Sequence, residues 1–321
     1  MTRREWLTRA AARLAAAGCE DAAFDARCLL EDLGGLGRGR AADDTPLDEA
    51  ALPRLEQAAA ERAAGRPLQY ILGEWDFLTL TLSVGEGVLI PRPDTEVLCE
   101  TAAEQLRTQA APQVLDLCAG SGCVGLGLAS LCPGAAVTLV ELSPEALPYL
   151  RRNTARYPQW NTRVVQADVL TDAAAFPERY DAILSNPPYI PTADLPGLQR
   201  EVQREPVMAL DGAADGLRFY RAIAGQWVPK LTPGGLCAVE VGCGQAAAVA
   251  AILAAAGLER VTAVPDAAGK RRISPGSRSH IRALSGRHNG LGLFAAFRER
   301  KPVRADRQGA FQRPSPRFRS A

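Results

Sequence analysis

The fold is decided by Val114-Leu-Asp-Leu-Cys-Ala-Gly-Ser-Gly122, where a short apolar run passes directly into a loop of small residues. The run predicts a buried strand, and the apolar positions after Cys123 predict a helix. Further apolar runs separated by helical patterns predict a mostly parallel, doubly wound α/β sheet of Rossmann-like type. The later strands are expected at residues 136–140, 163–167, 180–184, 236–241 and 261–264.

Acidic residues follow these strands at the edge where α/β sheets bind ligands. Glu141 ends the second strand and can accept both hydroxyls of a ribose, and Asp168 ends the third and can accept from the amine of an adenine. The loop at residues 118–122 lets a ligand approach backbone N–H groups, although it matches neither a dinucleotide fingerprint nor a Walker loop. Together these features predict a nucleoside cofactor.

Each of these features also has a purely structural interpretation. Small residues in a strand–helix turn often serve packing alone. Glu141 could be an exposed charge at a helix start, and Asp168 could cap the turn that follows it.

The turn Ser185-Asn-Pro-Pro-Tyr189 ends the fourth strand, because two consecutive prolines cannot continue a central strand. It places the carboxamide of Asn186 and two backbone carbonyls at the same sheet edge. A carboxamide offers one acceptor and two donors, which complement another planar amide or an aromatic amine. We therefore predict that residues 186–189 hold a planar nitrogen, and the alternative is a rigid turn with local hydrogen bonds only.

The charge distribution separates the body of the chain from its C-terminal end. Residues 270–321 contain 14 Lys and Arg against 2 Asp and Glu, which leaves 23 basic and 34 acidic residues elsewhere. An acidic body argues against an enzyme of duplex nucleic acid, which needs positive surface to neutralise phosphates. Gly, Ser, Pro and Arg dominate residues 275–321, so we expect a basic, disordered tail that could bind RNA weakly.

Cysteine and histidine usage limits the chemistry. The eight cysteines include no Cys-x-x-Cys pair, which favours reduced thiols over a zinc knuckle or a disulfide scaffold. The only histidines are His280 and His288, so the body has no histidine triad or histidine metal site, and no metal is expected. Because no signal peptide or run of transmembrane length occurs, we expect a cytoplasmic protein without membrane contact.

The first third of the chain changes character near residue 67. Apolar residues up to residue 66 recur at helical spacing, and one helix is expected to begin near Thr45-Pro46, with the alternative that Pro53 divides this region in two. Leu78–Val84 then alternates Leu or Val with Thr or Ser, which predicts a half-buried strand that Gly85-Glu-Gly87 turns towards Val88-Leu-Ile90. We interpret this segment as a hairpin that joins a helical domain to the α/β domain.

Several motifs together resemble a known family. Asp116-Leu-Cys-Ala-Gly-Ser-Gly122, Glu141, Asp168 and Asn186-Pro-Pro-Tyr189 resemble class I methyltransferases that use S-adenosylmethionine to methylate a planar nitrogen. Four more motifs narrow the resemblance to the protein-(glutamine-N5) methyltransferases that act on peptide chain release factors. They are Pro67-Leu-Gln-Tyr-Ile-x-Gly73, Leu89-Ile-Pro-Arg-Pro-Asp-Thr-Glu96, Asp215-Gly-Leu-x-Phe-Tyr220 and Glu240-Val-Gly242, and the resemblance spans residues 1–273.

The resemblance implies methyl transfer to the glutamine of the Gly-Gly-Gln motif of release factors. It implies a substrate-docking domain at residues 1–73, a hairpin linker at 74–92 and a methyltransferase domain at 93–274, followed by the tail at 275–321. The implied cofactor-binding residues are Asp116, Cys118, Ala119, Gly120, Ser121, Gly122, Glu141, Asp168, Val169 and Asn186. The implied substrate site consists of Asn186, Pro187, Pro188 and Tyr189, of which Asn186, Pro187 and Tyr189 are catalytic.

The expected chemistry is positioning. The Asn186 side-chain oxygen and the Pro187 carbonyl each accept one N–H of the substrate amide, and Tyr189 covers the reacting group. Two departures from the family pattern bear on cofactor affinity: Cys118-Ala119 replaces a more usual Gly-Thr, and Val169 replaces an aromatic that some relatives carry. Three alternatives stay open: adenine-N6 methylation of nucleic acid, glutamine methylation of a ribosomal protein, and a non-catalytic binding module.

Overall fold

The structure is a computed structural model that describes residues 1–37, 43–265 and 279–285. The chain begins with four helices, α1 (Arg3–Ala16), α2 (Ala22–Leu33), α3 (Leu52–Ala63) and α4 (Leu68–Leu72). The predicted helix start near Thr45-Pro46 is wrong, because α3 begins only at Leu52. Pro53 lies in the first turn of α3, where the backbone N–H that proline lacks would have no partner within the helix. The helices pack around one core that includes Trp6, Leu14 and Leu55.

A hairpin of β1 (Glu74–Phe77) and β2 (Leu80–Ser83) follows. The expected pairing of residues 78–84 with Val88-Leu-Ile90 is wrong, because the chain turns at Leu78 and Thr79, where Leu78 adopts a left-handed conformation (φ 53), and β2 pairs with the preceding strand β1. Alternation alone does not tell a strand's first residue from a turn residue. The inward positions were predicted well, since Leu80 and Leu82 are buried in the core of the following domain.

The central sheet has the order β5-β4-β3-β6-β7-β9-β8, and its first five strands are parallel. The mostly parallel α/β fold is therefore confirmed. The chain builds outwards from β3 and then crosses back to β6, so the strand order reverses between these two neighbours, where α/β folds form their ligand crevice. The strands are β3 (Gln113–Leu117), β4 (Ala136–Glu141), β5 (Asn161–Gln166), β6 (Tyr180–Ser185), β7 (Leu231–Val241), β8 (Leu258–Pro265) and β9 (Ser279–Ser285).

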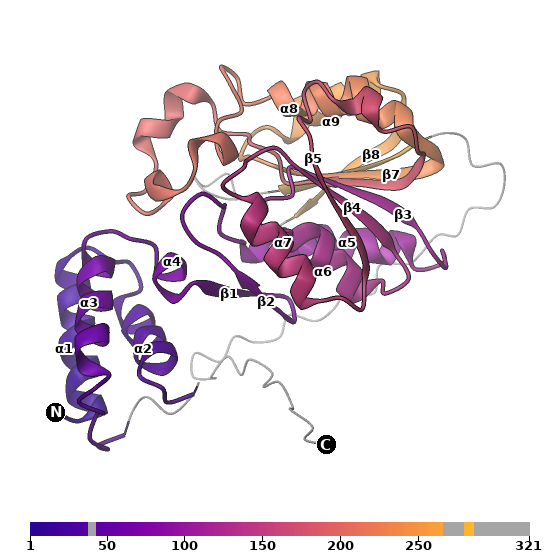
Figure 1. Cartoon of the computed structure of the whole chain (residues 1–321). Helices are drawn as coiled ribbons and strands as arrows, with labels where there is room; N and C mark the ends of the chain where they lie inside the picture. The colour runs from indigo at the N-terminus through magenta and orange to yellow at the C-terminus, as the bar shows by residue number, and fades with distance from the viewer. Residues whose placement is uncertain (38–42, 266–278, 286–321) are drawn as a thin grey trace, which may run out of the picture. The chain divides into compact units, whose positions relative to one another are not determined.

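Helices cover both faces of this sheet (Figure 1). One face carries α5 (Pro93–Leu106), α6 (Cys123–Leu131) and α7 (Leu147–Arg156), and the other carries α8 (Arg218–Ala222) and α9 (Ala246–Ala255). Successive side chains of a strand point to opposite faces of the sheet and so pack into two separate cores. In β3, Leu115 and Leu117 pack on the side of α8 and α9, and Val114 packs on the side of α5 to α7. Asp116 shares the direction of Val114 and so points towards α6.

Strand β9 corrects the predicted tail. Residues 279–285 were expected to be disordered, but they pair antiparallel with both β7 and β8. The apolar residues of β9 alternate over only a few positions, and Arg, Ser and Gly residues surround them in the sequence. Backbone pairing with β7 and β8 therefore determines its conformation. The rest of the expected tail, residues 275–278 and 286–321, lies outside the described residues.

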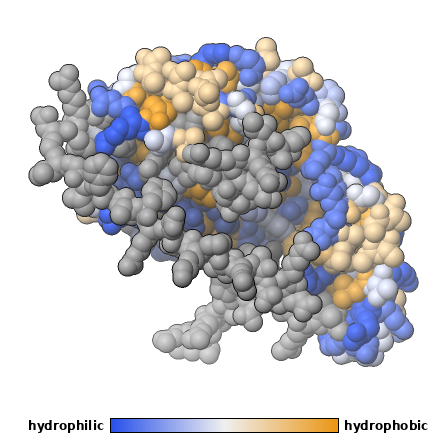
Figure 2. Space-filling view, turned by 180° about the vertical axis from the view of Figure 1, so that it is seen from behind, coloured by the Kyte–Doolittle hydropathy of each residue, from blue (hydrophilic) through white to orange (hydrophobic). Residues whose placement is uncertain are grey.

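Helices of the described residues are all too short or too polar to cross a membrane. The face of the molecule in Figure 2 carries hydrophilic residues interspersed with hydrophobic ones.

Candidate active site

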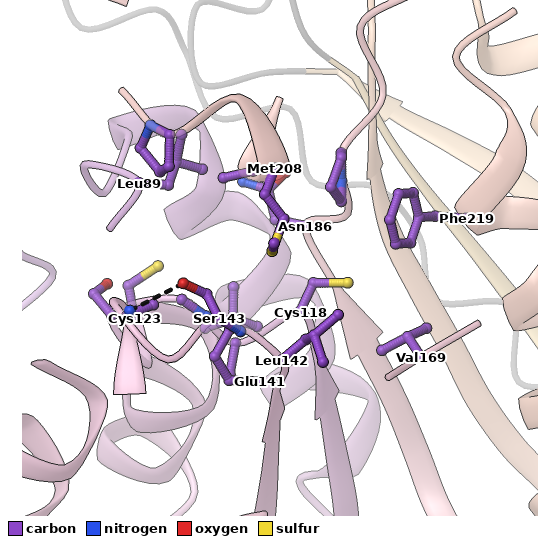
Figure 3. A pocket seen from close by; sticks show the side chains of 18 of the residues that line it. Leu89, Cys118, Cys123, Glu141, Leu142, Ser143, Val169, Asn186, Met208 and Phe219 are labelled. Atoms are coloured by element: carbon purple, nitrogen blue, oxygen red, sulfur yellow. Dashed lines mark hydrogen bonds between the residues drawn. The ribbon is translucent and has the colours of Figure 1, made fainter. Parts of the chain in front are cut away.

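A cavity of about 390 Å³ opens at the carboxyl ends of the parallel strands. This volume lies in the range of small-molecule sites. Loops after β3, β4, β5 and β6 contribute its walls, together with residues near 87–95, 206–209 and 218–219. The structure brings nine of the predicted site residues to this cavity, and Figure 3 labels four of them, Cys118, Glu141, Val169 and Asn186. The nine are Cys118, Ala119, Gly120, Ser121, Glu141, Asp168, Val169, Asn186 and Pro188.

Asp116 lies beneath the cavity and does not line it. Its side chain is fully buried, and its Oδ2 accepts the N–H of Gly125 at 2.8 Å, which ties β3 to α6. Its Oδ1 has no hydrogen-bond partner among the described residues. Burial raises the pKa of Asp116 to about 8, while the Gly125 N–H opposes this shift. A buried acceptor without a partner is costly, and a ligand that donates to it removes that cost.

Glu141 is fixed by two backbone donors. Its Oε2 accepts the N–H of Gly120 at 2.7 Å, and its Oε1 accepts the N–H of Ser143 at 2.7 Å. The side chain is only 8% exposed, so the alternative of an exposed helix-start charge is wrong. Each carboxylate oxygen keeps a lone pair for a further donor, which suits a pair of neighbouring hydroxyls in the cavity.

Asp168 combines its two predicted interpretations. Its Oδ1 accepts the N–H of Leu170 at 2.8 Å and so stabilises the turn after β5, and the same residue lines the cavity. Val169 beside it is buried, and its carbonyl accepts from the Trp227 indole N–H at 2.8 Å. Phe219, which precedes Tyr220 in α8, lines the cavity near Val169 (Figure 3). Phe219 lies in the motif Asp215-Gly-Leu-x-Phe-Tyr220, but the sequence pattern indicates no function for it.

Two thiols face the same cavity, Cys118 and Cys123. Burial raises the pKa of Cys118 well above its ordinary value and that of Cys123 to about 12. Both groups therefore stay protonated near neutral pH, and a protonated thiol is a poor nucleophile. Cys118 also adopts a left-handed conformation (φ 60), the conformation that the glycine more usual at this position takes without strain.

The Asn-Pro-Pro-Tyr turn divides between the cavity and the sheet. Asn186 and Pro188 line the cavity, whereas Pro187 and Tyr189 do not. The Tyr189 hydroxyl donates to Oε1 of Glu240 at 3.4 Å, and its carbonyl accepts from Gln245 at 2.8 Å. The prediction that Tyr189 covers the reacting group does not fit this position, because the buried carboxylate of Glu240 draws its phenol towards β7.

One wall of the cavity comes from residues to which no role had been assigned. Ile90 and Arg92 lie on the segment after the hairpin, and Val207 and Met208 lie in the long connection after β6. Glu205 joins these two segments: it is 4% exposed, accepts the N–H of Ile90 at 3.0 Å and bonds to the Arg92 guanidinium. The first segment carried a recognisable motif, but no local signal in the sequence marks Glu205.

Within the described part of the chain, no three His, Cys, Asp or Glu side chains gather as metal ligands do.

Comparisons with known proteins agree with this architecture. Residues 5–73 match the family described as PrmC N-terminal domain, and residues 94–197 match the methyltransferase small domain. A release factor glutamine methyltransferase from Moorella thermoacetica is 42% identical over 277 residues, which cover 85% of this chain and 97% of that protein. One from Geobacter sulfurreducens is 41% identical over 266 residues, covering 82% and 92%.

A solved structure supports the fold alone. The catalytic domain of hMettl16, in complex with an RNA hairpin, superposes with a TM-score of 0.53 at 18% identity and covers 80% of this chain and 98% of its own. Fold, cavity and domain match define a class I methyltransferase. At about 40% identity over most of both chains, the protein belongs to the release factor glutamine methyltransferase family.

Proposed function

We propose that the protein transfers a methyl group from S-adenosylmethionine to the side-chain amide nitrogen, N5, of the glutamine in the Gly-Gly-Gln motif of peptide chain release factors. One observation carries the proposal: Glu141, Asp168 and Asn186, which end three different strands, face a single cavity. Acceptors for a nucleoside and a carboxamide for a planar substrate thus lie side by side. The release-factor names of the relatives support this choice of substrate.

The residues present fit this cofactor. Asp116 does not line the cavity, so we assign it an indirect effect on the cofactor's amino group, through the start of α6, where its Oδ2 accepts the N–H of Gly125. Glu141 keeps lone pairs for the ribose hydroxyls, and Asp168 would accept from the adenine amine. Val169 offers no aromatic face, and we assign that function to Phe219, which lines the cavity near it. When bound, S-adenosylmethionine supplies an electrophilic methyl group on a positively charged sulfur.

The chain's own contribution is to hold and polarise the substrate amide. An amide nitrogen is a weak nucleophile because its lone pair is delocalised into the carbonyl. Oδ1 of Asn186 and the carbonyl of Pro187 would each accept one N–H of this nitrogen, which fixes its direction of attack. The same acceptors stabilise the positive charge that grows on nitrogen during transfer. The extra proton leaves afterwards, so no strong base is needed, and none of the described residues that line the cavity is a histidine.

A methylation assay tests the function. The protein is incubated with methyl-labelled S-adenosylmethionine and, separately, with a release factor, the same factor with Gln→Asn in its Gly-Gly-Gln motif, ribosomal proteins and RNA. We expect label only on the unmodified release factor, with mass spectrometry locating one added methyl on that glutamine. Label on RNA or on a ribosomal protein, with none on the release factor, would refute the proposal.

We further propose that residues 1–73 dock the release factor and that residues 74–92 link them to the methyltransferase domain. Because β9 completes the sheet, we extend that domain from residue 93 to at least residue 285. We also propose a cytoplasmic location, which is supported by the eight cysteines, all among the described residues, forming no disulfide.

A further inference from the structure

We propose that Thr95 and Glu240 are positioning residues that fix which way the Asn186 carboxamide faces, so that its oxygen is presented to the substrate nitrogen. This inference rests on the function proposed above. It concerns two residues that lie behind the Asn-Pro-Pro-Tyr turn, on α5 and β7.

Three side chains form a continuous hydrogen-bonded chain. Oε2 of Glu240 accepts the hydroxyl proton of Thr95 at 2.6 Å. Oγ1 of Thr95 in turn accepts from Nδ2 of Asn186 at 3.3 Å. Thr95 and Glu240 are both fully buried, so water does not compete for these groups.

The orientation of the carboxamide follows from counting protons. A carboxylate is an acceptor only, and a hydroxyl has a single proton to give. Once Thr95 gives that proton to Glu240, its oxygen can only accept, and Asn186 must turn its NH2 group towards it. A flipped carboxamide would set Oδ1 of Asn186 against the lone pairs of Thr95, an unfavourable contact in a buried site.

This orientation decides whether the site can hold the substrate. With Nδ2 turned towards Thr95, Oδ1 is the atom left to accept an N–H of the substrate amide. A flipped Asn186 would present N–H to N–H and would repel the positive charge that grows on the nitrogen. Glu240 therefore acts on the reaction through Thr95 and Asn186, without touching the substrate.

Glu240 is itself held from two further sides. Tyr189 donates to its Oε1 at 3.4 Å, and Tyr220 donates to its backbone carbonyl at 2.8 Å. The Glu240 carboxylate is thus linked to Asn186 through Thr95, and it accepts a hydrogen bond from Tyr189 directly. This arrangement gives the Glu240-Val-Gly242 motif a function.

The test compares Thr95→Val with Thr95→Ser, which differ in the hydroxyl. Wild-type methylation of a release factor is measured first, because its absence would refute the proposed function and not this inference. We expect Thr95→Val to lower kcat by about ten- to a hundredfold. The dissociation constant of S-adenosylmethionine, measured by calorimetry, and the KM for release factor should stay within about threefold, and Thr95→Ser should restore kcat to within about threefold of wild type. Equal kcat in wild type and Thr95→Val, a loss shared by Thr95→Ser, or loss of cofactor binding would each overturn the proposal.

A second pair of variants decides the matter if Thr95→Val does not fold. Asn186→Asp sets a carboxylate against Thr95, whose only proton is already given to Glu240, and should be inactive. Adding Glu240→Gln lets the glutamine N–H donate to Thr95, whose proton then turns to residue 186. We expect Glu240→Gln to lower kcat in the wild-type background and to raise it by at least about tenfold in the Asn186→Asp background. No gain in the double variant would overturn the proposal.

Discussion

The N–H of Gly120 donates to Oε2 of Glu141 over 2.7 Å, so the loop after β3 and the end of β4 share one carboxylate at the cavity. Glu141→Gln keeps the size of the side chain but offers only one acceptor atom for the two N–H groups and the ribose. We expect the dissociation constant of S-adenosylmethionine to rise by about ten- to a hundredfold, as for a lost charged acceptor of about 1.5–3 kcal/mol. Calorimetry measures this, with the exposed Glu104→Gln as control. An unchanged constant would refute the ribose function of Glu141.

Asn186→Ala separates chemistry from cofactor binding. The substitution removes the acceptor that orients the substrate nitrogen, so single-turnover methyl transfer should fall by at least about a hundredfold. Cofactor affinity should change by less than about threefold, because Glu141 and Asp168 hold most of the nucleoside. A variant with full methyl transfer would rule out the positioning mechanism.

Asp116 makes the stability of the protein depend on pH. Its folded pKa of about 8 lies far above the usual value for an unfolded aspartate, about 3.9. Between about pH 4 and about pH 8 the carboxyl group of Asp116 is protonated in the folded state and ionised in the unfolded state. The contribution of this proton to folding stability is therefore fully present below about pH 4 and is lost as the pH rises towards 8. The thermal stability of Asp116→Asn relative to wild type should therefore increase between pH 5 and pH 8, while cofactor binding weakens. Equal differences at both pH values would contradict the raised pKa.

The residues found by sequence reasoning share one property. Glu141, Asp168 and Asn186 each follow a predicted strand, and parallel strands bring their carboxyl ends to one edge. The local pattern was therefore enough to place them together. Cys118 was noted as a departure, but its left-handed conformation emerged only from the folded loop.

What sequence reasoning missed depends on packing between distant segments. Phe219 and Thr95 reach the cavity from helices whose rotation relative to the sheet no local pattern fixes. Glu205 bonds to Ile90, 115 residues earlier in the chain. Strand β9 exists through pairing with β7 and β8, and its own residues carry little preference for a strand.

The buried pair of Arg62 and Asp25 stabilises the helical domain. Its atoms lie 2.7 Å apart, and both side chains are 8% exposed. Arg62→Ala leaves the Asp25 carboxylate buried without its cation, which should lower the free energy of unfolding by about 3 kcal/mol. Denaturant unfolding measures the change. The exposed pair of Arg4 and Asp44 provides the control, and Arg4→Ala should have no measurable effect. Equal effects of both substitutions would contradict the prediction.

Cys118 occupies a backbone conformation that disfavours side chains. A left-handed residue other than glycine costs about 1–2 kcal/mol, and a β-branched side chain makes this worse. Cys118→Val should lower the melting temperature, whereas Cys118→Gly should hold it close to wild type, because relief of strain offsets the added freedom of the unfolded chain. Thermal unfolding of both variants tests this, and a Cys118→Val protein as stable as wild type would contradict it.

The contact of Glu205 with Ile90 and Arg92 joins the long connection after β6 to the segment between the hairpin and α5. Residues 90–92 form part of one cavity wall. A methyltransferase domain that began at residue 93 would therefore lack this part of the wall, and the buried Glu205 would lose the N–H of Ile90 and the guanidinium of Arg92 as donors. This segment is therefore part of the cavity wall and not only a connection between the two matched regions. Replacing or shortening the chain before residue 93 to change the substrate range would therefore also remove part of the cavity wall.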